Sequence, residues 1–133
     1  MEFEMRNILA AAFACLVTVA PSPTLAAGDA AKGEAVFKRC TACHAVGDGA
    51  KNKVGPELNG IIGRKVAAAP GFNYSPAFKA KAEEGWTWDD THLTEYLANP
   101  KAYIKGTKMA FPGLKKPEEI ADVIEYLKTF QTQ

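Results

Sequence analysis

The 133-residue chain has little sulfur, little net charge and no apolar run long enough to cross a membrane. Three cysteines are too few for a scaffold held together by disulfides. A net charge of +1 argues against a nucleic-acid binder that works by neutralising phosphates. With 47% hydrophobic and 23% charged residues, the composition also excludes a disordered or collagen-like chain. One small globular domain remains, and the positions of its few sulfur atoms carry the rest of the argument.

The longest apolar run lies close to the N-terminus and is followed by prolines and small residues. It spans roughly 13 residues, shorter than the ~20 of a membrane-spanning helix and typical of the core of a secretory signal peptide. We therefore predict a signal peptide at residues 1–26, cleaved after Ala26 or Ala27, and a mature domain at residues 27–133 in the periplasm. A buried N-terminal helix and a lipoprotein anchored through Cys15 are the weaker alternatives.

Removal of the predicted signal peptide leaves five side chains that can ligate a metal through sulfur or imidazole. They are Cys40, Cys43, His44, His92 and Met109. Any sulfur- or imidazole-based chemistry of the mature domain therefore depends on these positions.

Three segments have the period of amphipathic helices. The first runs from Asp29 to about Arg39 and begins at an aspartate suited to an N-cap. The second begins with two aspartates at residues 89–90, which favour a helix N-terminus, and ends at residues 99–100. The third begins at Pro117, and its apolar residues follow the 3.6-residue period. No segment shows strand alternation of useful length, so the predicted fold class is all-α.

Glycine and proline are concentrated between these helices. Residues 45–78 hold six of the eleven glycines and three of the eight prolines and predict a long loop region, with one short helix near residues 56–62. Residues 104–116 also lack periodicity. A few short helices and such long loops bury little apolar surface in a mature domain of about 107 residues. We therefore expect a buried prosthetic group to supply the missing apolar mass.

Residues 40–44 read Cys-Thr-Ala-Cys-His, the C-x-x-C-H sequence to which c-type haem is attached. Two thiols on one turn can each add to a vinyl group of the same porphyrin, while the histidine that follows faces the iron. Haem c is attached outside the cytoplasm in bacteria, which agrees with the predicted export. The sequence therefore predicts one haem c, covalently bound through Cys40 and Cys43.

Three other interpretations of this sequence are weaker. A thioredoxin-like redox pair follows a strand, and no strand is expected before Cys40. A zinc knuckle needs further ligands at metal spacing, and only the distant His92 remains. A structural disulfide leaves both His44 and the missing core unexplained.

Met109 is the predicted second axial ligand of the iron. A lone methionine is ordinarily a flexible core residue, but this one lies in an aperiodic loop between two glycines. The rival, His92, lies on a predicted helix between acidic residues and reads as a solvated side chain. Ligation by His44 and Met109 raises the potential of the iron and closes both axial positions, which suits electron transfer.

With these motifs the sequence resembles a class I cytochrome c, close to the group of bacterial cytochrome c2 and mitochondrial cytochrome c. The resemblance covers residues 28–133 and implies three to five short helices and long loops wrapped around the haem. It runs through Gly33, Phe37, 40–44, 55–58, 63–64, 71–74, Trp88, 96–97, 99–100, 103–104, 106–109 and 126–127.

The resemblance also implies roles for further residues around the haem. The carbonyl group of Pro56 is expected to accept the Nδ1 proton of His44. The residues expected to bond or neutralise the haem propionates are Arg64, Tyr74 and Trp88. The residues expected on the Met109 side are Tyr96 and Thr107. Each aromatic has the alternative role of a core residue, and Arg64 that of a surface arginine.

One segment departs from the mitochondrial pattern. Residues 75–86 are a few positions longer, and Phe78 stands about where a polar residue beside the haem is usual. We therefore carry no role over to residues 77–85.

Lysines flank the segments that are expected to carry the haem, whereas acidic residues gather elsewhere, so the chain has a dipole despite its small net charge. The resemblance implies that such lysines form a ring that docks on acidic patches of membrane redox complexes; solubility is the plainer interpretation. The lysines concerned are Lys51, Lys53, Lys101, Lys105, Lys108, Lys115 and Lys116.

The predicted function is that of a monomeric, periplasmic one-electron carrier rather than an enzyme. By resemblance, its donor is a bc1-type complex and its acceptor a terminal oxidase or a photosynthetic reaction centre. Two alternatives remain. One is a haem enzyme or gas sensor with a displaceable distal ligand, and the other is an electron-accepting subunit of a periplasmic dehydrogenase.

Overall fold

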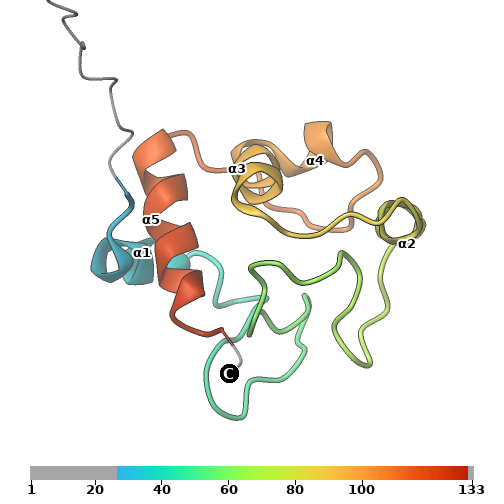
Figure 1. Ribbon diagram of the computed structural model, residues 1–133, viewed down its shortest axis with the longest axis horizontal. Coiled ribbons are helices and arrows are strands. Elements are labelled where there is room, and N and C mark those ends of the chain that lie inside the picture. The colour runs from blue at the N-terminus through green and yellow to red at the C-terminus, as the bar shows by residue number, and fades with distance from the viewer. Residues whose placement is uncertain (1–26, 132–133) are drawn as a thin grey trace, which may run out of the picture.

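The computed structural model describes residues 27–131, which form five short helices joined by long loops (Figure 1). The helices are α1 (Ala30–Phe37), α2 (Pro76–Glu83), α3 (Asp90–Ala98), α4 (Pro100–Tyr103) and α5 (Pro117–Lys128). Within these residues the extended backbone is limited to one isolated antiparallel bridge between Lys65 and Thr87. The predicted all-α fold class is therefore confirmed.

The predicted signal peptide at residues 1–26 lies outside the described part of the chain. Among residues 27–131, none of the helices is both long and apolar enough to cross a membrane.

Helices α1 and α5 cross closely and form one side of the molecule (Figure 1). Gly33 allows this approach, because a Cβ atom built on it falls 2.8 Å from the Cβ of Tyr126 and even closer to the backbone of Asp122. Phe37 then packs on the ring of Tyr126, with 5.4 Å between the centroids. The crossing thus depends on a position without a side chain in the middle of α1.

The helix ends follow the signals in the sequence. Asp29 caps α1 by accepting the N–H groups of Ala31 and Lys32, and Asp89 caps α3 by accepting that of His92 at 2.7 Å. Asn99 ends α3 as expected. Its side chain also accepts an N–H group at 3.3 Å in the next turn, so that the chain continues directly into α4.

Two segments differ from the expectation. Residues 56–62 form turns instead of the expected short helix; Gly60 has a φ angle of 63°, which breaks a right-handed helix there. Conversely, the loop region ends earlier than expected, because α2 begins at Pro76. Ser75 caps this helix by accepting the N–H group of Phe78 at 3.2 Å, and proline occupies the first helical position.

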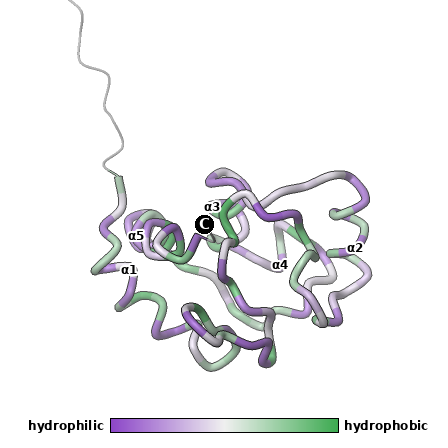
Figure 2. Tube along the Cα trace, turned by 60° about the horizontal axis from the view of Figure 1, so that its bottom comes forward, coloured by the Kyte–Doolittle hydropathy of each residue, from purple (hydrophilic) through white to green (hydrophobic). Residues whose placement is uncertain are grey.

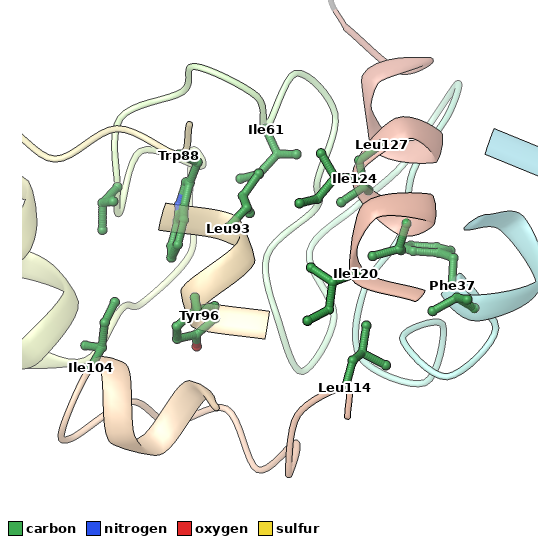
Figure 3. Close-up of a cluster of buried hydrophobic side chains, with 13 residues drawn as sticks. Phe37, Ile61, Trp88, Leu93, Tyr96, Ile104, Leu114, Ile120, Ile124 and Leu127 are labelled. Carbon is green, nitrogen blue, oxygen red and sulfur yellow. The ribbon is translucent and has the colours of Figure 1, made fainter. Parts of the chain in front are cut away.

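The buried side chains come from several elements and face a common interior. On α5 they are Ile120, Val123, Ile124 and Leu127, which confirms the predicted period. Figure 3 shows three of these opposite Trp88, Leu93 and Tyr96. Along the loops between α1 and α2, hydrophilic and hydrophobic residues alternate in short stretches, so these loops contribute apolar side chains singly rather than as a continuous face (Figure 2).

Candidate functional site

An apolar cavity of about 420 Å³ lies between the loops and helices α3 and α5. Its wall includes all ten residues that the sequence and the resemblance assign to a cofactor. They are Cys40, Cys43, His44, Pro56, Arg64, Tyr74, Trp88, Tyr96, Thr107 and Met109. Residues separated by up to 69 positions are therefore brought to one site.

The two cysteines lie on a hydrogen-bonded turn directly after α1. The N–H group of Cys40 bonds to the carbonyl of Phe37 at 2.7 Å, and that of His44 bonds to the carbonyl of Cys40 at 2.9 Å. Both thiols are free and partly buried. Burial raises the pKa of the Cys40 thiol, and the neighbouring Arg39 opposes that rise. The turn thus presents two thiols and one imidazole to the same cavity.

The imidazole of His44 is held in one orientation. Its Nδ1 atom lies 2.7 Å from the carbonyl oxygen of Pro56, so Nδ1 carries the proton and Nε2 keeps its lone pair. Burial lowers the pKa of His44, which favours the neutral, ligating form. Gly55 backs the ring: a Cβ atom placed there falls 2.8 Å from Nδ1 and 2.9 Å from Nε2. Glycine at this position is what leaves room for the imidazole.

The sulfur of Met109 is oriented by two hydroxyl groups. Tyr96 donates its hydroxyl hydrogen to Sδ of Met109 at 3.4 Å, and its oxygen lies 2.8 Å from Oγ1 of Thr107. That Oγ1 in turn accepts the N–H group of Met109 at 3.3 Å. Burial raises the pKa of Tyr96 to about 12, so the phenol stays protonated and can donate. The three residues form a closed set of bonds that holds the thioether at the cavity wall.

Arg64, Tyr74 and Trp88 occupy another part of the wall. The guanidinium of Arg64 bonds to the carboxylate of Glu57 at 2.9 Å, and it is only partly exposed. The hydroxyl of Tyr74 accepts the N–H group of Ala69 at 3.0 Å, and burial raises its pKa. The polar groups of Arg64 and Tyr74 are therefore each anchored to the protein by hydrogen bonds.

His92 does not line the cavity. Its ring stacks on Trp86, with centroids 4.4 Å apart and planes 13° from parallel, and its Nδ1 lies 2.7 Å from the carbonyl of Thr87. This packing keeps His92 out of the cavity wall.

A scan against protein families adds an independent finding: the model described as cytochrome c matches residues 30–131. The chain belongs to the cytochrome c family. Cytochrome c2 of Agrobacterium tumefaciens (strain II Chrys) is 57% identical over 100 residues, which is 75% of this chain and 90% of that protein. Cytochrome c-550 of Ancylobacter novellus is 58% identical over 100 residues, or 75% and 94% of the two chains. The solved structure of cytochrome c2 from Rhodospirillum centenum has a TM-score of 0.75 at 44% identity, covering 79% of this chain and all of that one.

Membership of this family makes the chain an electron carrier with one haem c attached through Cys40 and Cys43. The structure fits that cofactor. The cavity is apolar, two free thiols lie on one turn of its wall, and a neutral imidazole follows them. Thioether formation, a nitrogen ligand and apolar enclosure are what haem c requires of its protein.

Sequence reasoning missed several residues of the wall. Phe78 of α2 is the main one, because its ring lies 5.9 Å from Tyr74, 6.0 Å from Trp88 and 5.8 Å from Tyr96. The missed signal is the Ser75-Pro76 pair, which begins a helix and thereby turns Phe78 inward. Val54 also lines the cavity, although 79% of its surface is exposed, and it marks an apolar part of the rim.

The seven lysines predicted to dock partners are all exposed. Lys108 lines the cavity, and its Nζ lies 3.4 Å from the carbonyl of Asn73. Lys53 adjoins Val54 and donates to the carbonyl of Thr41, within the Cys40–Cys43 turn. At least these two lysines are therefore at the rim.

Proposed function

We propose that this chain is a periplasmic one-electron carrier in which Nε2 of His44 and Sδ of Met109 ligate the haem iron. The observation that carries the proposal is that both side chains line the same apolar cavity and that each is held in a fixed orientation by the protein. Haem c supplies an iron that cycles between Fe(II) and Fe(III) with no bond chemistry on a substrate.

The residues around the cavity favour rapid electron transfer over ligand binding. Pro56 fixes the imidazole of His44, and Tyr96 with Thr107 fixes the sulfur of Met109. Ligands that are held in place move little when the charge of the site changes. The apolar wall, which includes Phe78 and Leu93, keeps water and small molecules away from the interior. Two closed axial positions work against a peroxidase or a gas sensor.

The proposed partners are membrane redox complexes, with a bc1-type complex as donor and a terminal oxidase or photosynthetic reaction centre as acceptor. The apolar Val54 and the exposed Lys108 line the cavity, and the exposed Lys53 adjoins Val54 in the chain. Such a surface suits a brief encounter that charge orients and that an apolar contact completes. The predicted signal peptide supports a periplasmic location.

Replacement of the thioether tests the ligand set. In holo-protein carrying Met109→Ala, we expect loss of the sulfur-to-iron absorption band in the red, a lower reduction potential and ready binding of carbon monoxide. Phe111→Ala is the matched control, because Phe111 also lines the cavity but carries no ligand atom. Persistence of the red band in Met109→Ala would contradict the proposal.

A further inference from the structure

Glu57 and Arg64 form an ion pair that is largely shielded from solvent. The carboxylate Oε1 lies 2.9 Å from Nη1 of Arg64, and the two side chains are 18% and 16% exposed. Arg64 also donates to two backbone carbonyls, that of Asn59 at 3.0 Å and that of Glu57 itself at 2.8 Å. The arginine therefore has anchors that do not depend on the carboxylate.

The two members of the pair face different surroundings. Arg64 lines the haem cavity, and so do Pro56 and Leu58 on either side of Glu57. Glu57 is not part of that wall; it borders a shallow hollow together with Lys51, Asn52 and Asn59. The carboxylate is thus placed behind Arg64, seen from the cavity.

Glu57 is held firmly in this place. Its backbone N–H donates to Oδ1 of Asn52 at 3.0 Å, and its Oε2 accepts the N–H group of Asn59 at 2.7 Å. Both carboxylate oxygens are occupied, one by Asn59 and one by Arg64. A negative charge that has fixed partners and is largely shielded from solvent acts on its surroundings more strongly than an exposed surface pair does.

We propose that Glu57 offsets the positive charge of Arg64 and thereby lowers the reduction potential of the haem. A positive charge at the cavity wall favours reduced haem over oxidised haem, because the reduced iron carries one positive charge fewer and is repelled less. A carboxylate directly behind that charge cancels much of its effect. Glu57 is thus a tuning residue that does not itself touch the cavity. The inference rests on the proposed one-electron function.

The test is the midpoint potential of the holo-protein with Glu57→Gln, which keeps the side chain's length and an acceptor oxygen but removes the charge. We expect the equilibrium constant for reduction to rise roughly three- to tenfold, or about 30–60 mV at 59 mV per tenfold change. Arg64→Gln is expected to shift the potential in the opposite direction, and the double variant to lie near the original value. Glu118→Gln, the same change at an exposed position of α5, is the matched control.

The sign of the shift separates tuning from a merely structural role. If Glu57 only holds Arg64 in place, Glu57→Gln releases the arginine, and the potential falls or stays unchanged; either result would overturn the inference. Glu57→Asp keeps the charge and alters the contact, so it should stay close to the original potential, and a shift as large as that of Glu57→Gln would also overturn it. The red sulfur-to-iron band is recorded on the same samples. Its absence from the unmodified protein would contradict the proposed ligation, whereas a normal band without the potential shift would contradict only the role of Glu57.

Discussion

The α1–α5 crossing and the loop region before α2 are held together in different ways. The crossing combines regular backbone hydrogen bonds, the apolar stripe of α5 and a close approach at Gly33. The loops are held by scattered backbone hydrogen bonds and by single side chains that reach the backbone. Asn59, for example, bonds to both backbone groups of Gly47, and Asn52 bonds to the carbonyl of Pro70.

This difference separates the region that the protein stabilises by its own contacts from the region that also needs contacts with the haem. The helices have local signals and bury side chains against each other. The loops form much of the wall of the apolar cavity that fits the haem. The division is not complete, however, because Val123 and Leu127 of α5 line that cavity as well. Both regions therefore depend on the haem, and the loops depend on it more.

Loss of both thiols is expected to have the largest effect. In Cys40→Ser/Cys43→Ser the chain cannot attach haem, and an apolar cavity of about 420 Å³ remains unfilled. We expect loss of near-ultraviolet circular dichroism and of a cooperative unfolding transition. The unmodified protein should keep its haem through acid–acetone extraction, and Cys40→Ser should keep it through one thioether. Cooperative unfolding of the double variant without haem would show that the helices hold the fold alone.

Two glycine substitutions are expected to have the next largest effects, and they test the α1–α5 crossing and the loop region separately. Gly33→Ala forces a methyl group into the backbone of α5, so we expect the free energy of unfolding to fall by about 2–4 kcal/mol. The red absorption band should be unchanged, because Gly33 is not part of the cavity wall. Gly55→Ala places the same methyl group against the imidazole of His44 and should alter the haem spectrum directly. Denaturant titration and absorption spectra check both variants. Equal spectral changes in the two would contradict the view that only the loop region positions the haem ligand.

The same division explains how much the sequence predicted. The C-x-x-C-H sequence indicated the haem attachment site, and a lone methionine in a loop predicted the second ligand. Periodicity together with signals at the helix starts indicated α1, α3 and α5. Helix α2 was not predicted from the sequence, because Ser75-Pro76 is typical of turns as well as of helix starts. The hydrogen-bond partners of the loop residues could not be predicted for another reason: the bond between Glu57 and Arg64 depends on the path of the loop around the cavity. No local pattern encodes that path.

Removal of the Tyr96 hydroxyl should have a smaller effect that depends on pH. The pKa of Tyr96 is raised to about 12 in the folded chain, against an ordinary value of 10.0. The contribution of the protonated phenol to the free energy of unfolding is therefore complete below pH 10 and is lost as pH rises through 12. This rise in pKa corresponds to a difference of roughly 2–3 kcal/mol in the free energy of unfolding between pH values well below 10 and well above 12. We expect Tyr96→Phe to lose about 1 kcal/mol at pH 7, through its bonds to Thr107 and Met109, and to unfold with a weaker dependence on alkaline pH.

Urea titrations at pH 7, 10 and 12 check this expectation. Tyr103→Phe is the control, because Tyr103 lies outside the cavity wall and is only partly buried, whereas Tyr96 is buried. A parallel pH dependence of Tyr96→Phe and the unmodified protein would show that Tyr96 does not titrate with unfolding.

Charge reversal among the lysines should change the rate of electron transfer. At Lys101, which is exposed and does not line the cavity, it should leave stability and potential nearly unaltered. Reversal of Lys101 or Lys108 to Glu is expected to slow the bimolecular reaction with the physiological acceptor by about tenfold at low salt. The difference should shrink as the screening length falls from about 8 Å at physiological ionic strength to about 3 Å at 1 M. Lys32→Glu, on the outside of α1, is the control and should do little. It is a cleaner choice than Lys128, whose Nζ lies 3.0 Å from Asp90 and 2.8 Å from Glu125, so that reversal would also break two ion pairs. Equal slowing at all three positions would mean that net charge governs the encounter, and an absence of salt dependence would mean that partners dock on the apolar rim around Val54.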